Sequence, residues 1–199
     1  MRDYTNFEKH LEEIGKTIYV EPQIGYHEQL TKAAMEQFIN GKPIKDVLDV
    51  GFGTGYAMKL FGGRGMNVTG ISLDDSEING MKFHGFNVKK MDMAFLDFPN
   101  ESFDLLWCRH TLEHSVMPFI ALMEFQRVMR PGAHLYIELP SDSGIHVRNN
   151  NHFSLLSDQM WQSLFKKLSF VLLFRGQFAI TFPDMDDIYW HYWLKKNEN

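Results

Sequence analysis

The stretch that decides the fold is VLDVGFGTGY, residues 47–56, in which a short apolar run stops at a cluster of glycines. The run Asp46–Val50 has the composition of a buried strand in a parallel sheet. Gly51, Gly53 and Gly55 follow as G-x-G-x-G. Glycines at this point let backbone N–H groups approach a ligand at the positive end of the next helix. The stretch therefore predicts a ligand-binding turn between a strand and a helix.

Strand-like and helix-like segments alternate on either side of this turn. The expected strands are Asp46–Val50, Asn67–Leu73, Asn87–Met91, Phe103–Cys108 and Ala133–Leu139, and the expected helices cover about 56–61, 76–84, 118–129 and 157–167. Such alternation predicts right-handed crossovers and an open, mostly parallel sheet with helices on both faces.

The end of the chain has a different pattern. Two further strand-like runs, Phe170–Arg175 and Ile188–Leu194, are joined by a turn-rich segment without room for a helix. Strands joined in this way must pair antiparallel. The fold class predicted is α/β: a doubly wound, mostly parallel seven-stranded sheet with a C-terminal antiparallel hairpin.

The chain has 199 residues, which fits a single domain. Within it we expect an N-terminal helical cap over 1–42, a binding core over 43–140, and a loop, helix and terminal hairpin over 141–199. The segment 141–154 is long and polar and follows the carboxyl end of a strand, where long loops are usually functional.

Composition excludes several classes of protein. The formal net charge is -5, so the basic footprint of a nucleic-acid-binding or membrane-surface protein is absent. Cys108 is the only cysteine, which excludes an internal disulfide and a cysteine-rich zinc site. The N-terminus is too charged for a signal peptide, and no apolar run is long enough to span a bilayer. We expect a soluble, cytoplasmic protein, a monomer or homodimer, without nucleic-acid or membrane partners.

Four segments fall in order between about Val47 and Pro140: VLDVGFGTGY, VTGISLDD, MDMAFLDFPNESFDLLWCRHTLEH and EFQRVMRPGAHLYIELP. Together they resemble a class I S-adenosylmethionine-dependent methyltransferase of the broad small-molecule type, and the terminal hairpin is similar to the reversed last strand of that family. Other glycine motifs fit less well. Tyr56 stands where the dinucleotide fingerprint needs its third glycine, and no Gly-Lys-Ser/Thr follows as in a P-loop.

The resemblance implies S-adenosylmethionine as cofactor and suggests which residues bind it. Asp49 and the glycines at 51, 53 and 55 would line its methionine end, the acid favouring the ammonium group. Asp92 would accept from the adenine amino group, with Met93 adding a backbone donor. Cys108 would present its carbonyl to the ammonium.

The end of the second strand departs from the family pattern. Ser72, followed by Leu73, stands where the family usually carries an acid that binds both ribose hydroxyls. Asp74 or Asp75 could reach the ribose instead, or either could cap the next helix. This substitution keeps open the alternative of a non-catalytic module that binds S-adenosylmethionine without turnover.

Histidines follow two of the strands. Methyl transfer from a sulfonium is an in-line displacement, so the protein must align the reactants and take a proton if the acceptor is a hydroxyl. His110 and His114 after the fourth strand, and His152 in the long loop, are the candidate bases, since the histidine pKa lies near neutrality. The alternative for each, and for His146, is polar lining of a wet cleft.

Metal sites are considered and not favoured. HTLEH, residues 110–114, fits the zinc-protease pattern H-x-x-E-H, but too little helix separates the preceding strand from Pro118. Asp184, Asp186 and Asp187 could bind a hard cation, although such a cluster is more often a solvated turn between strands, which we expect here. No metal ligand is predicted.

The acceptor is narrowed by exclusion. The motif typical of base-amine methyltransferases is absent, since Arg109-His110-Thr111-Leu112 stands in its place, and Cys108 does not follow a proline as in cytosine-C5 enzymes. Arg109, Arg148 and Asn149–Asn151 would give the cleft cationic and polar groups. We expect O-methylation of a small sugar-like or carboxylated acceptor. The aromatic residues Tyr4, Phe7, Tyr19 and Tyr26 would form a lid or pack on the sheet.

Overall fold

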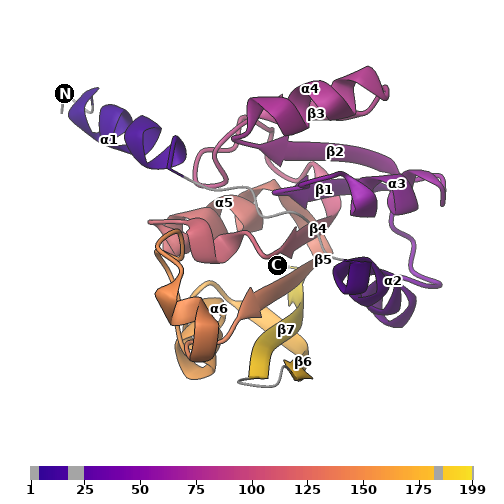
Figure 1. The fold of residues 1–199 in the computed structure, drawn as a ribbon. Coiled ribbons are helices and arrows are strands. Elements are labelled where there is room, and N and C mark those ends of the chain that lie inside the picture. The colour runs from indigo at the N-terminus through magenta and orange to yellow at the C-terminus, as the bar shows by residue number, and fades with distance from the viewer. Residues whose placement is uncertain (1–4, 18–24, 182–185, 199) are drawn as a thin grey trace.

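The structure is a computed structural model that describes residues 5–17, 25–181 and 186–198. One seven-stranded sheet, in the order β3-β2-β1-β4-β5-β7-β6, forms its centre (Figure 1). The strands are β1 Asp46–Val50, β2 Asn67–Ser72, β3 Asn87–Lys90, β4 Phe103–Arg109, β5 Met129–Pro140, β6 Phe170–Thr181 and β7 Asp186–Lys196. The helices are α1 Thr5–Gly15, α2 Gly25–Phe38, α3 Tyr56–Gly62, α4 Asp75–Phe83, α5 Pro118–Val128 and α6 Asp158–Lys167, with 3-10 turns at Leu112–His114 and Gly144–Arg148.

Strand directions confirm the predicted fold class. β1 pairs parallel with both β2 and β4, β2 pairs parallel with β3, and β4 pairs parallel with β5. β7 is antiparallel to both β5 and β6, so the chain ends in an antiparallel hairpin. The strand order reverses between β1 and β4, and ligands of doubly wound sheets bind at the carboxyl ends of the strands at such a reversal.

Helices cover both faces of the sheet, which explains why its central strands are apolar almost throughout. In β4, Leu106 and Cys108 point to the face covered by α5 and α6, whereas Leu105 and Trp107 point to the face covered by α2 and α3. Figure 1 shows these two pairs of helices on opposite sides of the sheet. Trp107 stacks on Tyr136 at 4.2 Å between ring centroids, which contributes about 0.5–1.5 kcal/mol beyond burial alone.

The terminal hairpin is longer than the sequence indicates. Residues 176–181, expected to belong to the turn, continue β6 and pair with β7. Phe178 stacks on Tyr189 at 5.3 Å, and Gly176 lies where a Cβ would overlap the ring of His191. The glycine and the short apolar runs of this segment favour a turn in the sequence. Contacts across the hairpin nevertheless make it a strand.

Candidate functional site

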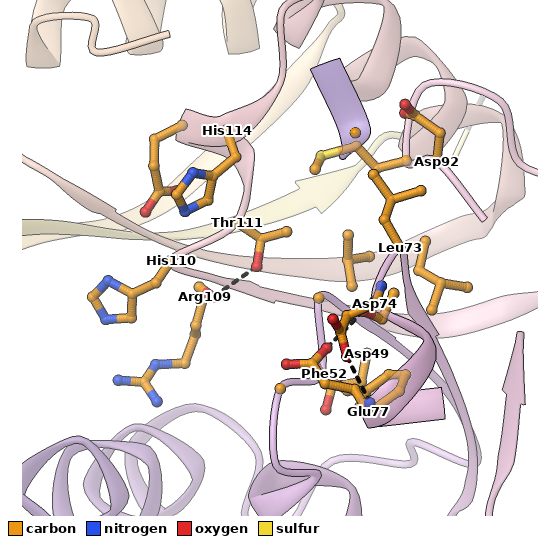
Figure 2. Close-up of a pocket in the computed structure, with 18 of the residues that line it drawn as sticks. Asp49, Phe52, Leu73, Asp74, Glu77, Asp92, Arg109, His110, Thr111 and His114 are labelled. Carbon is orange, nitrogen blue, oxygen red and sulfur yellow. Dashed lines mark hydrogen bonds between the residues drawn. The ribbon is translucent and has the colours of Figure 1, made fainter. Parts of the chain in front are cut away.

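A cleft of about 1230 Å³ opens at the carboxyl ends of β1, β2, β3 and β4. Its walls also include residues of α1, α2, the 3-10 turn after β4 and the hairpin. Figure 2 shows Asp49, Asp74 and Glu77 on one side of it and Arg109, His110 and His114 on the other. The cleft therefore has an acidic side next to the glycine turn and a basic side next to the end of β4.

The glycine turn is held in a backbone conformation that side chains disfavour. Gly51 has a φ of 69°, and a Cβ there would overlap the side chain of Thr111. Gly55, with a φ of 72°, is the residue before α3, and a Cβ there would overlap Met81 of α4. Glycine at these positions lets the turn pack closely against two other elements and leaves its backbone facing the cleft.

Asp49 is buried at the end of β1 with an unsatisfied oxygen. The residue is 3% exposed, and its Oδ2 has no hydrogen-bond partner among the described residues. Burial raises the pKa of Asp49 from 3.8 to about 7, the charge of Arg109 lowers it in part, and Glu77 raises it further. A buried carboxyl that lacks a partner fits a cationic ligand group, such as the ammonium of a methionine moiety.

Asp49 should give the stability of the protein a characteristic pH dependence. Because its pKa is about 7 in the folded chain and 3.8 when exposed, the folded state holds a proton that the unfolded chain releases. The free energy of unfolding then falls as pH rises between these values and levels off above them. Asp49→Asn removes this slope, so the variant should gain up to about 4 kcal/mol relative to wild type between pH 4 and pH 8.

Urea unfolding of both proteins across this pH range measures the difference. Other titrating groups are shared, so their contribution cancels in the comparison. Stability curves that stay parallel from pH 4 to pH 8 would contradict the raised pKa of Asp49.

The structure brings most of the predicted cofactor residues to the cleft. Those that line it are Asp49, Gly51, Gly53, Ser72, Leu73, Asp92 and Met93. Gly55 instead supports the turn from behind, and the side chain of Cys108 is fully buried in the core. The role predicted for Cys108 concerns its backbone carbonyl and stays a prediction.

Two aspartates also serve the local backbone. Asp92 Oδ1 accepts from the backbone N of Ala94 at 2.8 Å, so one of its oxygens stabilises the turn after β3. Asp74 caps α4, accepting from the backbone N of Glu77 at 2.8 Å. Of the two possibilities for Asp74, ribose binding or capping, the cap is what the structure shows.

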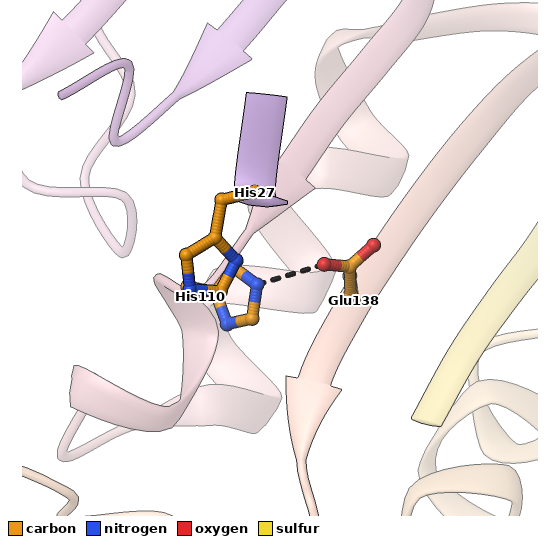
Figure 3. A group of neighbouring side chains, drawn as sticks. All are labelled: His27, His110 and Glu138. Atoms are coloured by element: carbon orange, nitrogen blue, oxygen red, sulfur yellow. Dashed lines mark hydrogen bonds and ion pairs between the residues drawn. The ribbon is translucent and has the colours of Figure 1, made fainter. Parts of the chain in front are cut away.

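His110, which lines the cleft, is paired with the buried Glu138 (Figure 3). His110 Nε2 is 2.7 Å from Glu138 Oε1, and Arg109 donates to the same oxygen. The Glu138 side chain is 1% exposed, so its charge needs these partners. Burial alone would raise the pKa of Glu138, but Arg109 and His110 hold it well below its usual range. Glu138 is therefore an ionised acceptor, and His110 Nε2 carries a proton.

The backbone of His110 is bound to the same strand. Its φ is 50°, an uncommon value for a residue other than glycine, and its backbone N donates to Glu138 O at 3.0 Å. Such conformations persist where surrounding contacts hold them, and they gather at functional sites. His27 packs against the His110 ring at 4.8 Å between centroids, and burial lowers the pKa of His27 to about 4, so it is neutral at neutral pH.

The other two predicted bases have structural partners. His114 Nδ1 lies 2.8 Å from Asn151 O. His152 Nδ1 lies 3.1 Å from His146 O and its Nε2 lies 3.2 Å from Asn149 Nδ2, so both of its ring nitrogens are engaged. Burial lowers the pKa of His152 to about 4, helped by its neighbours His114 and His146. These contacts favour His110 among the three.

The acidic segment of the hairpin differs from expectation at Asp187. The residue is 3% exposed, pairs with His146 and accepts from Tyr189 OH at 2.7 Å, so it is not a solvated turn residue. Asp187 lies opposite Ile180 of β6, and β7 also contacts the 3-10 turn Gly144–Arg148, which carries His146. Asp184 lies outside the described residues.

Residues that could bind a metal ion lie together at two places, but not in the geometry of a zinc protease. His110 and His114 do not share a helix, because only Leu112–His114 form a 3-10 turn. Among the described residues, two groups bring three possible ligand atoms within 4.8 Å of one another: His27, His110 and Glu138, and Glu113, His114 and His152. In the first group the buried guanidinium of Arg109 already binds Glu138, which disfavours a second cation there.

Two functional candidates were not predicted from the sequence. Glu138 is the only charged residue in the strand Ala133–Leu139, and a carboxylate next to the end of a buried strand is a usable signal. His27 lies in the first turn of α2, and nothing in its sequence surroundings separates it from surface histidines. Of the aromatic residues considered for a lid, Tyr26 lines the cleft and Phe7 contacts Phe95 at 6.2 Å, whereas Tyr4 and Tyr19 lie outside the described residues.

Comparison with known proteins agrees with this geometry. Residues 48–137 match the family described as methyltransferase domain. The matched segment runs from β1 into β5, makes up less than half of the chain and carries the glycine turn. Solved structures with the same fold include the cyclase SpnF, with a TM-score of 0.72, 16% identity, and coverage of 86% of this chain and 82% of that one. The YcgJ protein from Bacillus subtilis has a TM-score of 0.70 and 14% identity, and the match covers 87% and 100% of the two chains.

Relatives by sequence match about half of the chain. A ubiquinone biosynthesis O-methyltransferase of Hahella chejuensis is 32% identical over 101 residues, 47% of this chain and 42% of the relative. A 27-O-demethylrifamycin SV methyltransferase of Amycolatopsis mediterranei is 26% identical over 114 residues, 51% of this chain and 42% of the relative. The match thus spans less than half the length of these relatives.

Within the described part of the chain, none of the helices has the length and apolarity to span a bilayer.

Proposed function

We propose that this protein transfers the methyl group of S-adenosylmethionine to a hydroxyl oxygen of a small molecule. The observation that carries the proposal is the His110–Glu138 pair, because its histidine lines the same cleft as the buried carboxyl of Asp49 and the glycine turn. When bound, S-adenosylmethionine supplies a methyl group on a positively charged sulfur, which an oxygen nucleophile attacks in line. The chain's own task is then to align the acceptor and remove its proton.

His110 is suited to remove that proton. Glu138 accepts from Nε2–H, so the lone pair of the neutral ring is on Nδ1 and can accept a proton from an acceptor hydroxyl. The positive charge that forms on the ring is stabilised by Glu138, as a buried carboxylate stabilises the histidine of a catalytic triad. Glu138 also accepts from Tyr136 OH at 2.9 Å, which fixes the position of the carboxylate.

The acceptor that fits best is sugar-like or carboxylated. Arg148 and Asn149 line the cleft on the side of the histidines, and both groups bind hydroxyl or carboxylate oxygens. The relatives named as O-methyltransferases support oxygen as the methylated atom. The net charge of -5 supports a small-molecule acceptor over nucleic acid. The proposal also takes the protein to act in the cytoplasm, as a monomer or homodimer.

A binding protein without methyl transfer is the second candidate. Ser72 in place of an acid at the end of β2 favours it, and the structural similarity to a protein named as a cyclase indicates that this fold also serves other chemistry. Calorimetry with S-adenosylhomocysteine, followed by incubation with methyl-labelled S-adenosylmethionine and a fractionated metabolite extract, separates the two. Binding with label transfer to a small molecule is the expected result. Binding without transfer supports the second candidate, and no binding at millimolar ligand contradicts both.

A further inference from the structure

The hydroxyl of Ser72, the last residue of β2, is engaged by two neighbours. Ser72 Oγ lies 2.6 Å from Glu77 Oε2 and 3.0 Å from the backbone N of Asp74. Because the N–H of Asp74 donates, the hydroxyl accepts there and gives its single proton to Glu77. Ser72 therefore holds a carboxylate at the end of β2, although it is not an acid itself.

The position of Glu77 follows from the way α4 begins. Asp74 caps the helix by accepting from the backbone N of Glu77, a contact that stabilises the first turn. Glu77 lies in the first turn, is half-buried and lines the cleft beside Ser72. Asp75, the other acid of this turn, is exposed and pairs with Lys90 at 2.7 Å. Glu77 is thus the acid of α4 that is held at the end of β2.

Glu77 lies on the path between the two predicted ends of the cofactor site. β2 is flanked by β1 and β3, which lead to Asp49 and Asp92 respectively. The charge of Glu77 also acts on Asp49, whose pKa it helps to raise. A ligand that extends from Asp49 to Asp92 has to pass the end of β2, where Ser72 and Glu77 lie.

The chemistry of Glu77 suits a sugar diol. In the described part of the chain, the hydrogen bond given to its carboxylate comes from Ser72 and uses Oε2. An ionised carboxylate offers about four acceptor sites, so acceptors remain for two more hydroxyls. In doubly wound nucleotide-binding folds, an acid that follows the glycine turn binds the ribose hydroxyls in this way.

We propose that Glu77, held by Ser72, accepts hydrogen bonds from the two ribose hydroxyls of S-adenosylmethionine. The inference rests on the cofactor site of the proposed function and adds a ribose-binding residue that comes from α4 rather than from the strand. The chain then compensates for the missing acid of β2, which removes the reason to regard Ser72 as a mark of weak cofactor binding.

Calorimetry with two ligands tests the assignment. S-adenosylhomocysteine and its 2′,3′-dideoxy analogue are titrated into wild type, Glu77→Gln and Glu36→Gln, the last an exposed helical glutamate away from the cleft. Wild type and Glu36→Gln should both prefer the hydroxylated ligand by about 10- to 100-fold, the range of charge-assisted hydrogen bonds. Glu77→Gln should reduce that preference to a few-fold while its affinity for the dideoxy analogue stays nearly unchanged.

Moving the carboxylate provides a second test. Ser72→Asp alone places two acids side by side, so it should weaken binding of S-adenosylhomocysteine. Combined with Glu77→Gln, Ser72→Asp should restore affinity to within a few-fold of wild type, because the double variant again carries one acid at this point. The restored double variant also shows that the Glu77 effect is not a failure to fold.

The outcomes separate this inference from the proposed function. If wild type binds neither ligand at millimolar concentration, the cofactor site itself is wrong. If wild type binds S-adenosylhomocysteine but Glu77→Gln loses affinity for both ligands equally, or for neither, the ribose assignment to Glu77 is overturned and the cofactor site stands.

Discussion

Replacing His110 by asparagine should lower kcat for the acceptor found by label transfer by about 100- to 10,000-fold, the usual contribution of a general base. Asparagine is the chosen replacement because it tolerates the positive φ of 50° at this position better than alanine does. The affinity for S-adenosylhomocysteine should change less than about threefold, since the proposed cofactor contacts lie on the other side of the cleft.

His84→Asn is the matched control, because His84 is an exposed residue at the end of α4 and should leave kcat unchanged. Initial rates of label transfer at saturating cofactor give kcat and KM for each variant. If His110→Asn raises KM with kcat unchanged, His110 binds the acceptor and does not remove its proton. A wild-type rate in this variant would leave the base to His114 or His152, or to solvent.

Glu138→Gln removes the charge of the partner of His110, and it also affects Arg109. Arg109 is buried and binds both Glu138 and Thr31, so the neutral amide leaves a guanidinium without its counter-charge. Loss of stability should therefore accompany loss of rate. This coupling is the reason that His110→Asn, which leaves Arg109 and Glu138 together, is the cleaner measure of catalysis.

Features that depend on residues close together in the sequence were predictable, whereas features that depend on residues far apart were not. The strands and the glycine turn rest on short patterns, such as the apolar run before Gly51, and the structure has them where those patterns indicate. Residues 176–181 were not predicted as a strand, because their conformation depends on pairing with a segment that follows in the chain. Contacts across a sheet are not encoded in local composition.

The candidate site shows the same division. Asp49 and Asp92 end strands that can be identified locally, so their placement at one cleft was predictable. The partner of His110 was not, because Glu138 lies 28 positions away on a neighbouring strand and only the parallel register brings them together. Asp187 is a further example, since its burial depends on the separate loop that carries His146.

Replacing Gly51 by alanine should weaken S-adenosylhomocysteine binding by at least about 100-fold and lower the free energy of unfolding by about 2–5 kcal/mol. Two costs add: alanine at a φ of 69° costs about 1–2 kcal/mol, and overlap with Thr111 adds about 1–3 kcal/mol. Thr111 Oγ1 donates to Arg109 O at 2.8 Å, so relief of the overlap has to move the segment that also carries His110.

Gly41→Ala isolates the first of these costs. Gly41 has a φ of 75° and no atom within 4 Å of the position its Cβ would take, and it does not line the cleft. This control should lose only about 1–2 kcal/mol of unfolding free energy, with affinity unchanged.

Adding Thr111→Gly to Gly51→Ala removes the overlap and should recover part of the stability lost. If Gly51→Ala and Gly41→Ala behave alike in calorimetry and urea unfolding, close approach at Gly51 does not matter for binding, and the glycine turn is not the cradle of the cofactor.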